Sequence, residues 1–221
     1  MLIISTYLSI IVQVITGIIN LWGLHINVDD NKKIFKDLLN VELFIQNIEL
    51  VFYIWMANNL NIIQNITPYR YLDWIITTPT MLITLMAFLD KDKDNNKNNN
   101  LYNYIQKNKY FIIKIIVLNL IMLLFGLAGE LKYLDYNSAI ILGFIPFIYY
   151  FKLIHDKYII EKTSSENVNT YWFYFIIWSL YGIVAFLSYE YKNSAYNIID
   201  LFSKNFFSVF LVYLLWKNQK K

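Results

Sequence analysis

The sequence predicts an all-α protein, a bundle of seven transmembrane helices, and three observations lead to this fold class. The 221 residues are 57% hydrophobic and 16% charged, with a mean hydropathy of +0.40, whereas soluble domains are about 45–50% apolar and about 25% charged. Seven apolar stretches each have roughly the 20 residues that a helix needs to cross the hydrocarbon core. The segments between them alternate between lysine-rich and lysine-poor.

Polar segments separate the predicted spans along the whole chain. The expected spans are Leu2–Gly23, Ile34–Ala57, Ile62–Leu89, Tyr110–Leu131, Tyr136–Ile154, Thr170–Ser188 and Ser194–Trp216. The first is expected to stay in the protein, because it lacks the basic start and the cleavage site of a signal peptide. The run Lys91–Asn100 (KDKDNNKNNN) is expected to be a solvated loop. Because the spans nearly exhaust the chain, residues 1–221 are expected to form a single domain.

The lysines predict how the bundle is oriented. Fourteen of them lie in the 1–2, 3–4 and 5–6 loops and the tail, whereas Lys132 and Lys192 lie in loops on the other side. Cytoplasmic loops are enriched in Lys and Arg, so the N-terminus is expected to be extracellular and the C-terminus cytoplasmic. The sequence thus predicts a multi-pass integral membrane protein with the lipid bilayer as its main partner.

Composition also excludes several functions. There are no cysteines, so disulfides, thiol nucleophiles and cysteine metal sites are absent. The net charge of +3 is too small to indicate a nucleic-acid partner. The sequence has no constellation typical of a nucleophilic enzyme, a metal site or a phosphate loop. We therefore expect neither an enzyme nor a metal centre.

Charged residues inside membrane spans are costly and often functional. Six of those within the predicted spans stand out: Glu42, Glu49, Arg70, Asp73, Asp200 and Lys204. Lys204 lies near the middle of the last span, one helical turn after Asp200. Either Asp200 and Lys204 form an ion pair that fixes helix packing, or the Lys204 amine is reserved for a carbonyl ligand, which it binds as a Schiff base. A buried, protonated Schiff base needs counter-charges, which Asp73 and Asp200 can supply, with Arg70 offsetting the surplus negative charge.

At this point the sequence resembles the microbial (type 1) retinal rhodopsins, over all seven spans. RYLDWIITTP at residues 70–79 is similar to the RYxDWxxTTP stretch of that family, and the D-x-x-x-K ending at Lys204 to its retinal-lysine motif. The remaining matches are Trp178 and Tyr181 for W-x-x-Y, Met122 and Gly126 for Met-x-x-x-Gly, and Tyr53 for the tyrosine that hydrogen-bonds the last-span carboxylate.

The resemblance implies all-trans retinal on Lys204, with Asp73 as primary counterion and proton acceptor and Asp200 as second counterion. It implies that Thr77 hydrogen-bonds Asp73 and that Arg70 organises the extracellular side as a gate. The implied retinal pocket consists of Trp74, Thr77, Thr78, Met122, Gly126, Trp178, Tyr181 and Tyr53.

Departures from the family pattern bear on the activity. Outward proton pumps usually carry a carboxylate eleven residues after the counterion, and here that residue is Thr84. Gly182 and Ala185 stand where many relatives have a proline and a pocket tryptophan. Thr78 is expected to pair with Asn119, at a position that is often an aspartate.

Span 2 adds a polar stripe, because Glu42, Gln46 and Glu49 share one helix face. Ser9, Gln13 and Thr16 form a similar face in the first span. A stripe of this kind cannot face lipid. It is either a structural network with neutral glutamic acids or a hydrated cation pathway constricted by the two glutamates.

The first group of viral rhodopsins, from large algal and protist viruses, is similar in this stripe. The matching residues are Ser9, Glu42, Glu49 and Asn197. The resemblance implies a viral, light-gated channel for monovalent cations or protons, with these residues along the ion pathway. Two alternatives stay open: a weak outward proton pump, with Glu190 or Asp135 assisting proton release, and a photosensor that signals through a partner. The sequence leaves open whether the protein forms a homo-oligomer.

Overall fold

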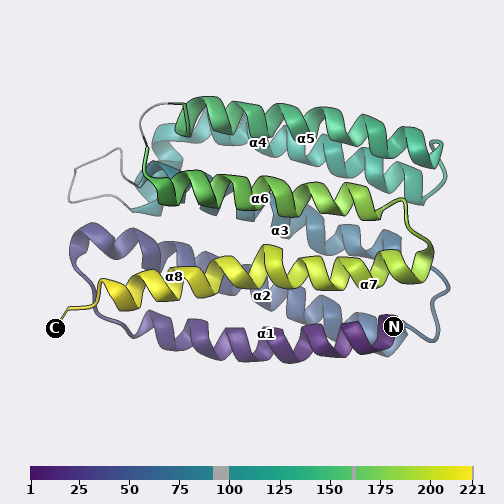
Figure 1. Cartoon of the computed structure of the whole chain (residues 1–221), viewed down its shortest axis with the longest axis horizontal. Coiled ribbons are helices and arrows are strands. Elements are labelled where there is room, and N and C mark those ends of the chain that lie inside the picture. The colour runs from purple at the N-terminus through teal and green to yellow at the C-terminus, as the bar shows by residue number, and fades with distance from the viewer. Residues whose placement is uncertain (92–99, 161–162, 221) are drawn as a thin grey trace.

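The computed structural model describes residues 1–91, 100–160 and 163–220, and within them the chain is almost entirely helical (Figure 1). The elements are α1 (Leu2–Leu24), η1 (Asp30–Lys32), α2 (Lys33–Asn59), α3 (Thr67–Asp90), α4 (Leu101–Glu130), α5 (Tyr136–Tyr158), α6 (Ser165–Val184), α7 (Tyr189–Asp200), η2 (Leu201–Asn205) and α8 (Phe206–Lys217). Because α7, the π-helical turn η2 and α8 follow one another without a break, they form one rod. The described residues therefore contain seven long helical rods.

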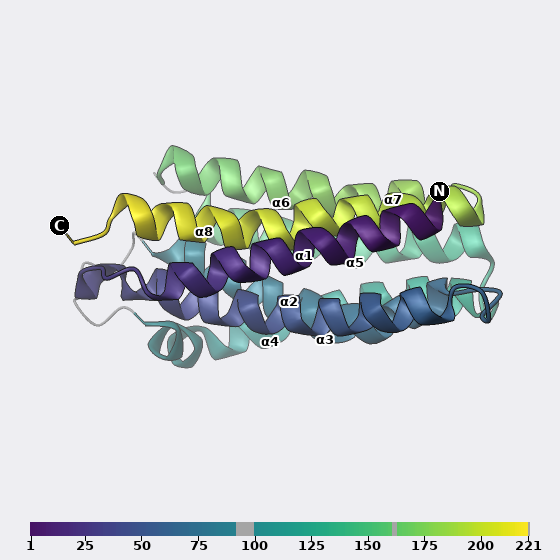
Figure 2. The same ribbon diagram turned by 90° about the horizontal axis from the view of Figure 1, so that it is seen from below.

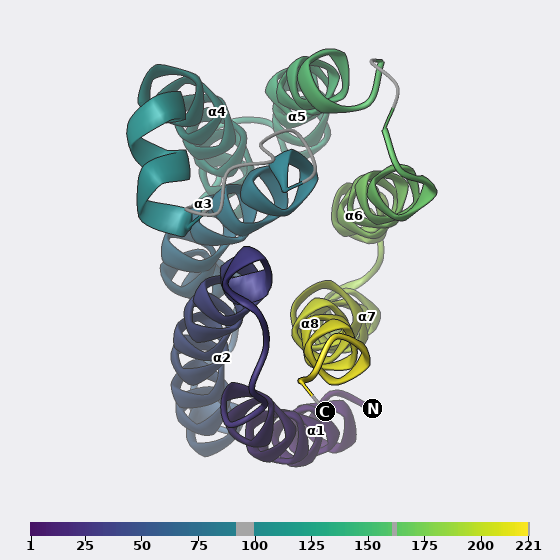
Figure 3. The ribbon, with the colours of Figure 1, turned by 90° about the vertical axis from the view of Figure 1, so that its left-hand side faces the viewer.

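The seven rods form a ring in chain order, seen end-on in Figure 3. The ring closes because α1 packs against both α2 and the α7–α8 rod, between which it runs in Figure 2. The two termini lie at opposite ends of the bundle (Figure 1). We refer to these as its N-terminal and C-terminal ends. The ring arrangement lets side chains of distant segments meet along its axis.

Among the described residues, α1–α5 and the last rod are long and apolar enough to span a bilayer. In α3 and the last rod, 61% of the most apolar window is buried inside the bundle, against 22–39% for the other four. α6 is a seventh rod whose first half carries several polar residues. The protein is thus a multi-pass integral membrane protein, and α3 and the last rod are the most buried of these six rods.

Four predicted helix starts are wrong by five or more residues: those of α3, α4, α6 and the last rod. α3 begins at Thr67 rather than Ile62, because the Asn65 side chain accepts a hydrogen bond from the Thr67 backbone amide (3.1 Å) and Pro68 suits a first turn. α4 begins at Leu101 rather than Tyr110, since Asn100 caps it by accepting from the Asn103 amide. Hydropathy therefore misses the polar start of α4 and extends α3 into apolar residues that precede it.

The last three spans also differ from their predicted limits. α5 continues to Tyr158, four residues beyond Ile154. α6 covers Ser165–Val184 rather than 170–188, because Ser164 caps its start, and Ser188 instead directly precedes α7. The last rod consequently begins at Tyr189 rather than Ser194. Residues 92–99 of the predicted Lys91–Asn100 loop lie outside the described residues.

Candidate functional site

Lys204 lies at the centre of the bundle and is 4% exposed. Its Nζ is 2.5 Å from Asp73 Oδ2, 3.6 Å from Glu49 Oε1 and 3.8 Å from Asp200 Oδ1. The three carboxylates come from α3, α2 and the end of α7, so three rods meet at one amine. The structure therefore brings together the two counterions expected from the sequence and adds Glu49, which had been expected on the ion pathway.

Two phenols hold Asp200. Tyr53 on α2 donates to Asp200 Oδ2 at 2.6 Å, and Tyr181 on α6 donates to Oδ1 at 2.5 Å. The Tyr53 bond follows the expectation, whereas Tyr181 had been assigned only to the pocket. Hydrogen bonds from neutral donors stabilise a buried carboxylate without adding charge. Asp200 is thus fixed in position next to the amine.

Arg70 is fully buried on the N-terminal side of this cluster. Its Nη1 is 3.6 Å from Asp200 Oδ2, while its Nε donates to Asn193 Oδ1 (2.9 Å) and its Nη2 to Asn197 Oδ1 (2.5 Å). Asn197 in turn donates to the hydroxyls of Ser5 and Thr6, at 2.9 and 3.0 Å. The guanidinium therefore links the carboxylates to neutral amides and hydroxyls; Asn193 was not foreseen as a partner.

The expected hydrogen bond from Thr77 to Asp73 forms, but on the backbone of Asp73. The Thr77 hydroxyl donates to the backbone carbonyl of Asp73 (2.9 Å), and not to its carboxylate. A threonine inside a helix can satisfy its hydroxyl on the carbonyl four residues earlier, and this local bond forms here. Asp73 Oδ1 has no hydrogen-bond partner among the described residues. The close contact of the Asp73 carboxylate is therefore the hydrogen bond that its Oδ2 accepts from Lys204.

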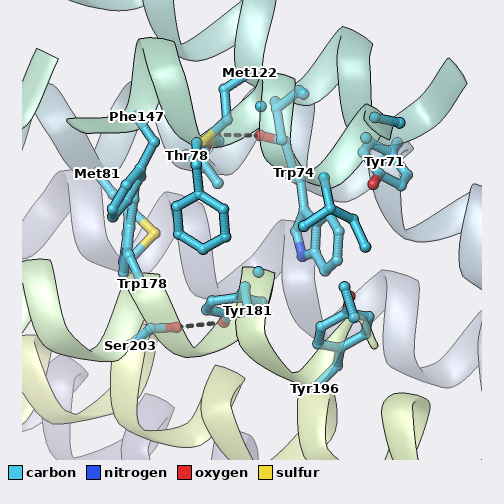
Figure 4. Close-up of a pocket in the computed structure, with 18 of the residues that line it drawn as sticks. Tyr71, Trp74, Thr78, Met81, Met122, Phe147, Trp178, Tyr181, Tyr196 and Ser203 are labelled. Carbon is cyan, nitrogen blue, oxygen red and sulfur yellow. Dashed lines mark hydrogen bonds between the residues drawn. The ribbon is translucent and has the colours of Figure 1, made fainter. Parts of the chain in front are cut away.

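A cavity of about 120 Å³ opens beside Lys204 between α3, α4, α5 and α6. Aromatic rings dominate its wall, and Figure 4 shows Trp74, Tyr181 and Tyr196 gathered along one part of it. Trp74 meets the two tyrosines edge-on, with ring centroids 5.6 and 5.3 Å away. The expected residues that line this cavity are Trp74, Thr78, Met122, Gly126, Trp178 and Tyr181. Tyr53 and Thr77, also expected there, are not part of the lining.

Small residues keep parts of this cavity open. A Cβ at Gly126 would overlap the Tyr71 hydroxyl, and one at Gly182 would overlap the Phe144 ring. Gly182 and Ala185, which depart from the family pattern, both belong to the lining. The Phe144 ring thus occupies the space that a side chain at position 182 would need.

A polar file continues from Lys204 toward the C-terminal end, between α1, α2 and η2. Gln46 donates to Asn205 Oδ1 at 3.1 Å and also bonds the Thr16 hydroxyl, which itself donates to Asn205 Oδ1 at 2.6 Å. Asn20 donates to Gln46 Oε1 at 2.8 Å. The stripe expected from the sequence therefore faces protein, as a network of neutral groups one turn from Glu49.

Glu42 lies further along the same face of α2, with 1% of its surface exposed. Its Oε1 accepts a hydrogen bond of 2.6 Å from Thr84 on α3. At the opposite end of the stripe, the Ser9 hydroxyl donates to the Asn197 backbone carbonyl (3.2 Å). Thr78 donates to Asn119 Oδ1 at 2.9 Å, which is the uncharged pair that the sequence suggested. The partnership of Glu42 with Thr84 was not predicted.

Comparison with known proteins identifies the family. A family model described as bacteriorhodopsin-like protein matches residues 1–218. The chain belongs to the bacteriorhodopsin-like family. It is similar to the crystal structure of viral rhodopsin OLPVRII, with 25% sequence identity, a TM-score of 0.85 and coverage of 98% of both chains.

Other solved members have the same fold. The blue light-absorbing proteorhodopsin from Med12 is 20% identical, with a TM-score of 0.75 over 98% of this chain and 96% of that one. The thermophilic rhodopsin from Rubrobacter xylanophilus is 19% identical, with a TM-score of 0.74 over 99% and 96%. No curated protein sequence matches the chain. The predicted resemblance to microbial rhodopsins is therefore confirmed.

The residues of this bacteriorhodopsin-like protein fit retinal, the chromophore of its family. An elongated apolar polyene suits a cavity walled by aromatic rings, and the Lys204 amine lies in the lining. Asp73 and Asp200 supply negative charge beside the nitrogen. The sequence predicted this lysine and its two aspartates; Glu49 could have been found with them, because it lies one turn before Tyr53 on the same face of α2.

Proposed function

We propose that this protein is a light-gated cation channel that binds all-trans retinal through Lys204. In this proposal residues 1–221 are one domain with an extracellular N-terminus. The observation that carries it is the position of Glu49. Its carboxylate is 3.6 Å from Lys204 Nζ, and it shares a helix face with Gln46 and Glu42. A change of charge at the lysine therefore acts directly on the polar file between α1, α2 and η2.

When bound, retinal supplies light absorption and isomerisation. The chain's own groups then handle the proton and the charge. Asp73, 2.5 Å from Lys204 Nζ, is the acceptor for a proton that leaves this atom. Asp200 cannot turn toward the amine without breaking its bonds to Tyr53 and Tyr181. The two aspartates thus have different tasks: Asp73 exchanges the proton, and Asp200 supplies a fixed charge.

The hydrogen bonds of Gln46 close the pathway in the dark. Gln46 joins α2 to Thr16 on α1 and to Asn205 on η2. Asn205 directly follows Lys204 in η2. A movement of the Lys204 backbone would therefore displace Asn205 and weaken its hydrogen bonds to Gln46 and Thr16. Opening this junction would connect Glu42 on one side with Glu49 on the other, and carboxylates along a pore favour cations over anions. Arg70, Ser9 and Asn197 line the extracellular half.

The test is a patch-clamp recording of cells that express the protein with added retinal, with light flashes at several voltages. A photocurrent that reverses sign, with a reversal potential that follows the cation gradient, supports the channel. A current of fixed outward sign at all voltages, or pigment without current, contradicts it. Lys204→Ala is expected to abolish visible absorption and photocurrent together. Glu49→Gln is expected to change conductance or selectivity while pigment still forms.

One observation favours a second function, an outward proton pump. Thr84 occupies the position of the usual proton donor, and its hydroxyl donates to Glu42 at 2.6 Å. A carboxyl group is therefore present at that level, supplied by α2 instead of α3. On the release side, Asp135 caps α5 by accepting from Ser138 (2.9 Å), and Glu190 binds the Met1 amine (2.8 Å). The voltage series above separates the pump from the channel.

A further inference from the structure

Charge balance at the Lys204 site leaves one carboxylate in surplus. Among the residues that the structure describes, the cluster holds three carboxylates, Asp73, Asp200 and Glu49, and two cations, Lys204 and Arg70. All five side chains are buried, with exposures of 0–4%. An uncompensated charge at such depth is strongly unfavourable. One of the three carboxyl groups is therefore expected to carry a proton in the dark.

Hydrogen bonding separates the three carboxyl groups. Asp200 accepts from two phenols and lies 3.6 Å from Arg70, and Asp73 accepts from Lys204 at 2.5 Å. Neither oxygen of Glu49 has a hydrogen-bond partner among the described residues. Its contact with Lys204 is 3.6 Å long. Because donors favour the ionised form of a carboxyl group, Glu49 is the member that gains least from ionisation.

The surroundings of Glu49 contain the groups that respond to its charge. Lys204 and Asp200 face it from η2 and the end of α7, Asp73 from α3, and Tyr53 from its own helix. On α1, which packs against α2, the buried side chains of Ser9 and Gln13 are neutral. Ionisation of Glu49 would therefore add a negative charge beside Lys204 Nζ, where the amine now has Asp73 as its nearest partner.

We propose that Glu49 is a third, protonated partner of Lys204 in the dark and that its ionisation adds a negative charge beside the retinal nitrogen. This inference rests on retinal binding at Lys204 as proposed above. In the ground state of a protonated retinal pigment the positive charge is concentrated near the nitrogen, and light excitation moves it along the polyene. A further negative charge at Glu49 stabilises the ground state more than the excited state. Absorption then shifts to shorter wavelength.

The experiment compares the wild type with Glu49→Gln in two measurements. Absorption spectra are recorded while the pH is raised, and the infrared carbonyl stretch of protonated carboxyl groups is recorded with and without retinal. The wild type is expected to shift to shorter wavelength as the pH rises. Glu49→Gln is expected to match the wild-type spectrum at neutral pH, to lose this shift and to lose one carbonyl band in both preparations.

Glu42→Gln is the matched control, since it replaces the other buried glutamate of α2, which is bonded to Thr84 and not to Lys204. It is expected to keep the pH-dependent shift. A red-shifted Glu49→Gln spectrum at neutral pH, as expected on loss of a charged counterion, would overturn the proposal. An unchanged pH titration in Glu49→Gln would overturn it too.

A second variant covers the case in which Glu49→Gln forms no pigment. In Glu49→Asp the carbonyl band is expected to move rather than vanish, in the chain without retinal as well as with it. A band that stays unchanged would assign the proton to another group. The outcomes are separate from those of the channel proposal: Lys204→Ala tests retinal attachment, and the reversal potential tests conduction, whichever group holds the proton.

Discussion

The ion pair of Lys192 with Glu130 makes the sharpest stability prediction in the molecule. Lys192 Nζ on α7 lies 2.8 Å from Glu130 Oε1 on α4 and 3.1 Å from the Tyr136 hydroxyl on α5. The two charged side chains are 9% and 6% exposed. Tyr136 also donates to the Ala185 carbonyl at 2.8 Å, just beyond α6. This cluster therefore joins four rods at the N-terminal end of the bundle.

The energies of this pair nearly cancel as long as both partners are present. At 2.8 Å and an effective dielectric constant of about 20, the Coulomb attraction is about 6 kcal/mol. Desolvation costs several kcal/mol for each ion. Glu130→Gln removes the attraction and leaves Lys192 desolvated, so the free energy of unfolding should fall by about 3–5 kcal/mol. Glu130→Gln combined with Lys192→Met should recover most of this loss.

Unfolding by a denaturing detergent in mixed micelles, followed by helical circular dichroism, measures these free energies without a chromophore. Glu190→Gln serves as the control, because that carboxylate is 59% exposed and solvent screens its pair with the Met1 amine. A loss below about 1 kcal/mol in Glu130→Gln would refute the reasoning, since it is the size expected for an exposed pair. A double variant no more stable than Glu130→Gln would refute it as well.

Two further predictions concern proton return and the cavity. Thr84→Val removes the 2.6 Å hydrogen bond to Glu42 with little change of shape. Flash photolysis should then show proton return to the Lys204 site slowed by about fivefold, the equivalent of about 1 kcal/mol. An unchanged rate would exclude Glu42 from this step. Gly182→Ala places a methyl group against the Phe144 ring, so titration with retinal should show weaker pigment formation. Gly17→Ala is its control, because there the nearest atom, in Gln46, is 3.8 Å away. Equal pigment yields in the two glycine variants would contradict the packing argument.

Periodicity along one helix was enough to predict several parts of the site. Asp200 and Lys204 are four residues apart, and Glu42, Gln46 and Glu49 share a face of α2; both relations follow from 3.6 residues per turn. Contacts between helices were harder. The sequence places Thr84 only where pumps usually carry a proton donor, whereas its hydroxyl on α3 bonds Glu42 on α2, because the rotation of one helix against the other decides which side chains meet.

By itself the sequence determined the class of the protein: apolar runs of membrane-spanning length, a buried lysine one turn from an aspartate, and the family motifs around them. These are one-dimensional signals, since length and helical spacing are local properties of the chain. Only the tertiary structure decided that Glu49 meets Lys204, that Thr84 holds Glu42 and that Lys192 pairs with Glu130. Such pairings depend on how each helix is rotated and how deep it sits against its neighbours. Packing around the whole ring sets that rotation, and no single span encodes it.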